Sequence, residues 1–204
     1  MVTAKHVPTS LRSGRLLSPV PHFERWVIIK MITRNQILNA AKMESELHRR
    51  IHITCAIRYQ GDAAMQAWHD ATNAWHARSS EIDYLWGDDF MEQVRLGDRQ
   101  AMEDALVYLE VDPWYHRSGY LKERLIRAVK RAPLNDRDMM RLRNVVWNVA
   151  HGMNRREFRN YCSLALRIRT PQFESMLDDI SDDVDLRSKG KISFLRNYLN
   201  NNKV

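Results

Sequence analysis

The chain has 204 residues, of which 44% are hydrophobic and 28% are charged. This length suits one domain, and the apolar fraction is enough for a core that needs neither disulfides nor a metal. Cys55 and Cys162 stand far apart in the sequence, which fits a reduced, cytoplasmic setting better than a secreted scaffold. No apolar run reaches the roughly 20 residues of a membrane-spanning helix, so we expect no membrane partner.

The net charge of +7 conceals a strong segmentation along the chain. Residues 62–113 hold 12 acidic and 3 basic side chains, whereas residues 114–169 hold 14 basic and 4 acidic ones. Blocks of opposite sign indicate either that the two segments neutralise each other within the fold, or that one of them binds a charged partner.

Composition divides the chain into three regions. Residues 1–32 hold three prolines and five basic groups, and we expect a flexible basic segment, with Met31 as an alternative start of translation. Residues 33–181 form the predicted helical domain. Residues 182–204 are polar, and we expect them to be partly disordered.

Capping residues, glycines and prolines divide the domain into short helices. Thr33 and Gln36, for example, have the spacing of a capping box, in which side chains bind the free N–H groups of a first turn. Short connections predict that consecutive helices are antiparallel neighbours. The predicted helices, in chain order, cover residues 33–59, 62–78, 81–95, 98–110, 113–118, 120–131, 136–151, 155–169 and 171–181, with a weaker one near 191–199.

The segment IHITCAIRY, residues 51–59, also fits a strand because its apolar residues alternate with polar ones. The rest of the sequence offers no strand for it to pair with. We therefore favour the helix and keep the strand as the alternative.

The stretch WHDATNAWHA, residues 68–77, repeats Trp-His after seven residues. In a helix Trp68 and Trp75 share one face and indicate a packing seam. His69 and His76 would lie about 10 Å apart along the axis, too far to bind one metal ion directly, since ligands lie about 2 Å from it. We interpret them as histidines at the edge of the seam.

A second histidine cluster, Glu44, His48, His52 and Cys55, falls on one face of the first helix. His-x3-His is a known metal geometry, but no second cluster completes a site. We therefore favour packing histidines, keep a helical metalloenzyme as a distant alternative, and predict no metal and no cofactor.

Sequence motifs for catalysis are absent. The carboxylates in WGDDFMEQV, residues 86–94, could act as an acid and a base, but they also suit the acidic first turn of a helix. The sequence contains no nucleophile elbow, P-loop, GxGxxG or HExxH. We therefore predict no catalytic residues and favour a protein that is not an enzyme.

The basic segment carries the strongest functional indication. In the predicted helices 120–131 and 155–169, apolar residues form one stripe and basic residues lie opposite. The basic residues of this arginine face are the candidate contacts for a partner or for phosphate, namely Arg124, Arg127, Lys130, Arg131, Arg156, Arg159 and Arg167.

The helix predicted between them, residues 136–151, carries a second apolar face at Met140 and Trp147. Such a helix is either buried on two sides within a stack or exposes an apolar contact site. Helix pairs of this kind look like an α-solenoid of the HEAT type, although no repeat of about 40 residues aligns. The predicted fold class is all-α, with antiparallel hairpins stacked in an α-solenoid-like manner or packed as an irregular bundle.

Three roles remain open for the arginine face. It could be neutralised by the acidic segment, it could bind an acidic protein partner or a second copy, or it could contact nucleic acid. Trp114, Tyr115 and Tyr120 could stack on bases, although we favour them as core anchors. Four phosphate contacts would give a plot of log K against log salt a slope of about −3 to −4. We favour a non-catalytic interaction module that acts as a scaffold or adaptor, with non-sequence-specific nucleic-acid binding as the alternative.

Overall fold

The computed structural model describes residues 31–178 and 185–202, so the predictions for residues 1–30, 179–184 and 203–204 lie outside the described residues. Regular structure in the described part is entirely helical, which confirms the predicted all-α class. The elements are α1 (Arg34–Ile57), α2 (Asp62–Ala77), the 3-10 helix η1 (Asp83–Trp86), α3 (Asp88–Leu96), α4 (Arg99–Val111), α5 (Ser118–Val129), α6 (Asp136–His151), α7 (Phe158–Ile168), α8 (Pro171–Asp178) and α9 (Leu186–Asn201).

Helix α1 starts as its sequence predicts. The Thr33 side chain accepts a hydrogen bond from the Gln36 backbone, and the Gln36 side chain accepts one from the Thr33 N–H at 2.8 Å. The helix continues through the segment that alternates like a strand, and Ile53 and Ile57 remain exposed on it. The helix that we favoured for this segment is therefore confirmed.

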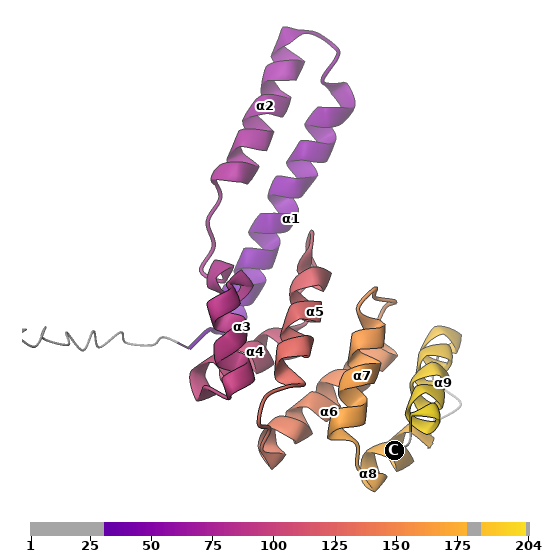
Figure 1. The fold of residues 1–204 in the computed structure, drawn as a ribbon. Coiled ribbons are helices and arrows are strands. Elements are labelled where there is room, and N and C mark those ends of the chain that lie inside the picture. Colours follow the sequence, from indigo (N-terminus) through magenta and orange to yellow (C-terminus); the bar gives the residue numbers. More distant parts are fainter. Residues whose placement is uncertain (1–30, 179–184, 203–204) are drawn as a thin grey trace, which may run out of the picture.

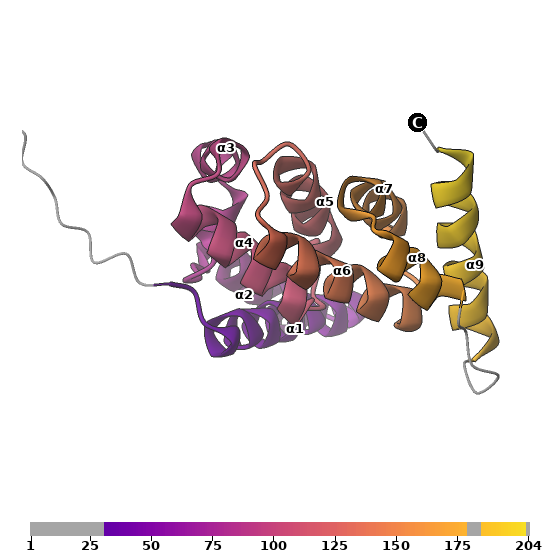
Figure 2. The same ribbon diagram turned by 90° about the horizontal axis from the view of Figure 1, so that it is seen from below.

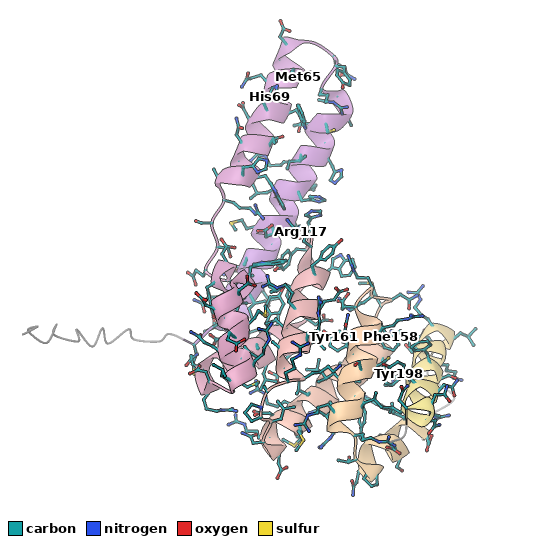
Figure 3. The ribbon with its side chains drawn as sticks, in the orientation of Figure 1. Met65, His69, Arg117, Phe158, Tyr161 and Tyr198 are labelled. Carbon is teal, nitrogen blue, oxygen red and sulfur yellow. The ribbon has the colours of Figure 1, made fainter. Side chains whose placement is uncertain are left out.

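Helices α1 and α2 form a long hairpin that stands out from the rest of the molecule (Figure 1). On α2 Ala71 is buried and Trp68 and Trp75 are half-buried, whereas His69 and His76 are exposed, as the seam interpretation predicts. Figure 3 places His69 near the tip of the hairpin and Arg117 at its base.

The remaining helices form two layers. Figure 2 shows α3, α5 and α7 side by side in one layer, with α4, α6 and α8 in the second. Helix α5 contacts both α3 and α7, α4 contacts α6, and α9 closes the far end against α6 and α7. This arrangement is compatible with the α-solenoid-like prediction.

Helix α6 lies inside the stack, in contact with α4, α7 and α9. Leu142, Val146 and Val149 are buried. Of the predicted second apolar face, Met140 is 54% exposed, whereas Trp147 is half-buried against the core, with its ring 4.2 Å from that of His151.

The structure corrects one predicted element and alters two others. Residues 113–118 were expected to form a short helix, but α4 ends at Asp112 in the left-handed conformation, with φ 49°, and the chain runs without regular structure to Ser118. Gly87 divides the predicted helix 81–95 into η1 and α3. Helix α9 is longer than the predicted 191–199, because Ile192, Leu195 and Leu199 bury a stripe against the body.

Ion pairs between the acidic and basic segments join α4 to α6 within the second layer. Arg141 of α6 binds Glu103 and Glu110 of α4, at 2.7 and 2.6 Å. In the reverse sense, Arg99 of α4 binds the fully buried Asp138 of α6 at 2.7 Å. Part of the charge segmentation is therefore neutralised within the fold.

Replacing Asp138 by alanine should lower the free energy of unfolding by about 2 kcal/mol. Its carboxylate accepts hydrogen bonds from Arg99 and from the Asn135 N–H that opens α6, and both would be lost. Asp136→Ala, an exposed change in the same turn, should cost less than about 1 kcal/mol. Urea denaturation of both variants measures the difference; equal losses would contradict this role for Asp138.

Candidate functional site: an aromatic and basic pocket

The structure does not gather the predicted arginine face into one surface. Arg124 turns toward η1 and α3, where it binds the Trp86 carbonyl at 2.6 Å and Asp88 at 2.5 Å. Lys130 donates to the Ser163 hydroxyl of α7. Both cations are therefore used to join neighbouring helices of the first layer.

The other predicted residues keep more freedom. Arg127 and Arg156 share the carboxylate of Glu123, at 3.7 and 3.3 Å, and both remain more than half exposed. The last three are exposed and form no ion pair with any residue that the structure describes, namely Arg131, Arg159 and Arg167. Arg131 follows the C-terminal end of α5, whereas Arg159 lies in the first turn of α7, so these charges are spread along the layer.

The loop between α4 and α5, residues 112–117, carries a different and more concentrated group. Burial alternates along it: Pro113 and Tyr115 are buried, whereas Trp114, His116 and Arg117 are exposed. The buried residues are anchors, and the exposed ones project at the base of the α1–α2 hairpin. Trp114 is 62% exposed, an unusual environment for so large an aromatic side chain.

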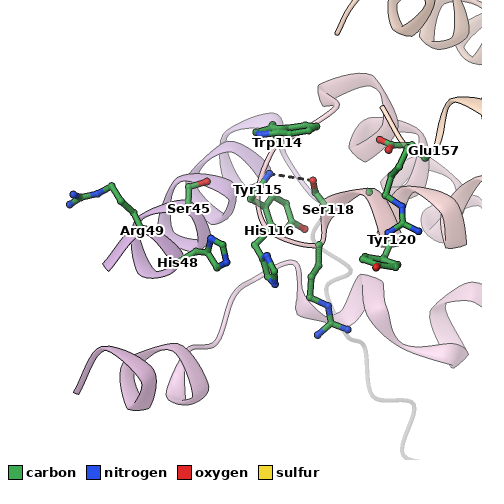
Figure 4. Close-up of a pocket in the computed structure, with 12 residues that line it drawn as sticks. Ser45, His48, Arg49, Trp114, Tyr115, His116, Ser118, Tyr120 and Glu157 are labelled. Atoms are coloured by element: carbon green, nitrogen blue, oxygen red, sulfur yellow. Dashed lines mark hydrogen bonds between the residues drawn. The ribbon is translucent and has the colours of Figure 1, made fainter. Parts of the chain in front are cut away.

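Tyr115 fixes the middle of this loop. Its hydroxyl lies 2.8 Å from that of the fully buried Tyr108. Its N–H donates to the Ser118 hydroxyl at 3.2 Å, the dashed line in Figure 4. Burial raises the pKa of Tyr115 to about 12, so the phenol stays protonated and can donate at neutral pH.

A buried ion cluster holds the start of the loop. Lys122 of α5 is 0% exposed, and its Nζ lies 2.5 Å from Asp112 Oδ1 and 3.6 Å from Glu157 Oε1. Arg155 binds the second oxygen of Asp112. Burial lowers the pKa of Lys122, and the neighbouring Asp112 carboxylate opposes that shift. The cluster therefore links the end of α4 to α5 and to the start of α7.

Both ends of the loop have a backbone conformation that side chains disfavour. Asp112 has φ 49° and Arg117 has φ 67°, and they are the described non-glycine residues with positive φ. The left-handed region costs about 1–2 kcal/mol for an ordinary residue, and such strain gathers at functional sites. The buried ion pairs and the Tyr115 anchors offset this cost.

The exposed side of the loop borders a pocket of about 570 Å³ between α1 and the N-terminal ends of α5 and α7 (Figure 4). Tyr115, His116 and Arg117 separate it from a smaller hollow of about 290 Å³. The lining of the larger pocket is Ser45, His48, Arg49, Trp114, Tyr115, His116, Arg117, Ser118, Gly119, Tyr120, Arg156 and Glu157.

The pocket is electrostatically suited to an anion. Arg117 is exposed and has no ion pair within the described ranges, although its guanidinium lies 5.8 Å from the centre of the Trp86 ring. Arg156 stacks over Tyr120 at 3.8 Å. Helices α5 and α7 both begin without a side-chain cap, so the positive ends of their dipoles add to these charges. Arg49 contributes less, since Glu46 binds it at 2.7 Å.

The histidine cluster proposed from the sequence is engaged by other partners. His48 stacks on His116 with ring centres 4.1 Å apart, and the buried Glu44 binds Arg78 at 2.6 Å. In residues 31–178 and 185–202, no group of three or more His, Cys, Asp or Glu side chains is arranged to hold a metal ion. His48 is the member of the cluster that lines the pocket, whereas Glu44 lines the smaller hollow.

Searches among protein-family models, curated proteins and solved structures found no match to this chain. Among the helices that the structure describes, none combines the length and apolarity needed to cross a membrane.

The sequence contains a signal for this site, but it is ambiguous. Asp112-Pro113 is read as the start of a helix, whereas the structure uses it as the end of one. Trp114 and Tyr120 were favoured as core anchors, and they are 62% and 48% exposed; Tyr115 is indeed an anchor. The sequence shows Trp114, Tyr115 and Tyr120 beside Arg117. Burial of Tyr115 alone among them depends on its contacts with Tyr108 of α4 and Ser118 of α5.

Replacing Lys122 by methionine should lower the free energy of unfolding by about 3–5 kcal/mol, because it removes the cation from a buried cluster of carboxylates. Lys130→Met is the matched control: this lysine is half-buried and contacts only a hydroxyl, so the expected loss is below about 1 kcal/mol. Chemical denaturation compares the two, and a Lys122→Met protein of wild-type stability would rule out the structural role of the cluster.

Proposed function

We propose that this chain is a non-catalytic interaction module that binds an acidic protein segment in the pocket bordered by the loop 112–117. The observation that carries the proposal is the way this loop is built. Buried anchors and ion pairs hold a strained backbone so that Trp114, His116 and Arg117 are presented to solvent. A fixed loop gains affinity because little conformational entropy is lost when a partner binds.

The residue types of the pocket support protein recognition. Trp, Tyr and Arg dominate the binding energy of protein interfaces, and here Trp114, Tyr120, Arg117 and Arg156 surround one hollow. Its volume of about 570 Å³ is in the range of pockets that take one compact group. Exposed Arg159, in the first turn of α7, extends the positive charge beyond the pocket. An acidic segment with one apolar or aromatic side chain satisfies both features.

Nucleic acid remains the alternative occupant, supported by the exposed rings of Trp114 and Tyr120 beside two guanidiniums. Single-strand binding, however, uses a groove whose cations follow the phosphate backbone over several nucleotides. The predicted cations that could have formed such a groove are partly used inside the protein, at Arg124 and Lys130. We therefore favour the protein partner.

The test uses a fluorescein-labelled peptide rich in Asp and Glu with one central Trp, titrated with the full chain in anisotropy. Arg117→Glu with Arg156→Glu should weaken binding by at least about 100-fold, since two of the three guanidiniums that line the pocket are replaced by carboxylates. Arg34→Glu with Arg137→Glu makes the same change in net charge at exposed positions outside the pocket and should weaken binding less than about threefold. Equal losses in the two variants would contradict a specific site.

A single-stranded DNA oligonucleotide distinguishes the alternative at ~50 mM salt. We expect the acidic peptide to bind more tightly than this DNA, and Trp114→Ala to weaken the peptide by about tenfold or more. Binding of DNA alone, abolished by the same Arg117 and Arg156 changes, would replace the protein partner by nucleic acid.

A further inference from the structure

Two histidines connect the projecting hairpin to the proposed binding pocket. His48 comes from α1 and His116 from the loop 112–117, and their rings stack with an interplanar angle of 19° and centres 4.1 Å apart. Both line the pocket, and Figure 4 shows them side by side. The pair therefore forms part of the contact between α1 and the loop 112–117, and it also lies on the surface that a ligand in the pocket would touch.

The surroundings of the pair are crowded by other rings. The Trp75 ring of α2 lies 5.6 Å from each of them, and His52, one turn beyond His48, lies 4.4 Å away. The titratable and charged groups around the pair, from α1, from the end of α2 and from the loop, are Glu44, Arg49, His52, Arg78, Tyr115 and Arg117. Glu44 is the carboxylate of this set, and Arg78 neutralises it.

This environment favours uncharged rings in the free protein. Burial lowers the pKa of His48, and the nearby His116 lowers it further. Burial also lowers the pKa of His116, with an added contribution from Arg117. At pH 7.5 both rings are therefore neutral and can stack, whereas two imidazolium rings at this distance would repel each other.

We propose that the His48–His116 pair couples binding of an acidic segment in this pocket to proton uptake, so that the segment binds more tightly at pH 5.5 than at pH 7.5. This inference rests on the proposed function, because it concerns the same pocket. Carboxylates placed beside the pair favour the imidazolium form, so the complex holds more protons than the free protein between these pH values.

The sign of the effect follows from linkage. A ligand that raises a pKa binds more tightly as the pH falls from the bound-state value toward the free value. Folding has the opposite effect on these pKa values: it lowers the pKa of His48 and of His116. The unfolded chain binds protons near pH 6.5 and the folded one only below that, so stability is full above pH 6.5 and falls as the pH drops. Acid thus weakens the contact between α1 and the loop while it adds positive charge to the pocket.

The acidic peptide described above is a suitable probe, because its carboxylates stay ionised between pH 5.5 and 7.5. We expect its dissociation constant to fall by about tenfold from pH 7.5 to pH 5.5, the change that one pKa unit of coupling gives. In His48→Gln with His116→Gln this pH dependence should be lost. His76→Gln, an exposed histidine of α2 outside the pocket, should retain it.

The outcomes separate the two proposals. Binding that is equally tight at both pH values in the wild type, or a pH dependence that survives in the double variant, overturns the proton coupling and leaves the proposed function intact. Absence of peptide binding at both pH values overturns the proton coupling and the proposed function together. Histidine ring resonances followed by NMR give an independent check: on addition of peptide, the pKa of His48 or His116 should rise, and unchanged titration curves would contradict the inference.

Discussion

The buried ammonium of Lys122 is the interaction on which the arrangement of this molecule depends. It lies at the junction of three helices, with the carboxylates of Asp112 and Glu157 on either side. Glu157 is buried and Asp112 is half-buried, and carboxylates held away from water need a cation beside them. Lys122 supplies this cation where α4, α5 and the start of α7 meet. Asp112, which takes part in this contact, has the left-handed conformation that ends α4. The loop 112–117 and its exposed tryptophan follow from that one constraint.

Charge in this protein has two uses that the sequence presents as one. Arg124, Arg141 and Arg155 bind carboxylates of the acidic segment and connect helices. Arg117 and Arg156 lie instead at the mouth of a pocket, beside aromatic rings. An ion pair between helices lowers the positive potential of the surface. A guanidinium at a concave site that has no ion pair among the described residues, as Arg117 has none, raises that potential. The division between these uses sets where an acidic partner is expected to bind.

The projecting hairpin of α1 and α2 supplies one wall of the pocket, and part of its contact with the loop 112–117 is made by histidines. Helix α1 contacts α4 near its start, whereas α2 packs mainly on α1. Contact between the hairpin and the loop includes the stacked His48 and His116, and burial lowers the pKa of each. A contact between two histidine rings depends on pH and on nearby anions because the rings can be protonated, whereas an aliphatic contact does not. His48, which the sequence places in a possible metal cluster, thus has a different role because of its stacking on His116.

Local signals in the sequence determined most of the secondary structure. The capping boxes at Thr33 and Asn135 and the end of α3 at Gly97 depend only on residues within one turn, so patterns identify them. The seam at Trp68 and Trp75 follows from helical period alone. Only the tertiary structure decided which arginines are bound within the fold, because carboxylates such as Asp88 and Glu103 lie tens of residues from Arg124 and Arg141. It also decided which tyrosine is an anchor, because burial of Tyr115 against Tyr108 requires α4 and the loop to pack together. Asp112-Pro113 marks the boundary: the same two residues can begin a helix or end one, and the choice was made by Lys122 and Arg155, which the chain brings to Asp112 only when it folds.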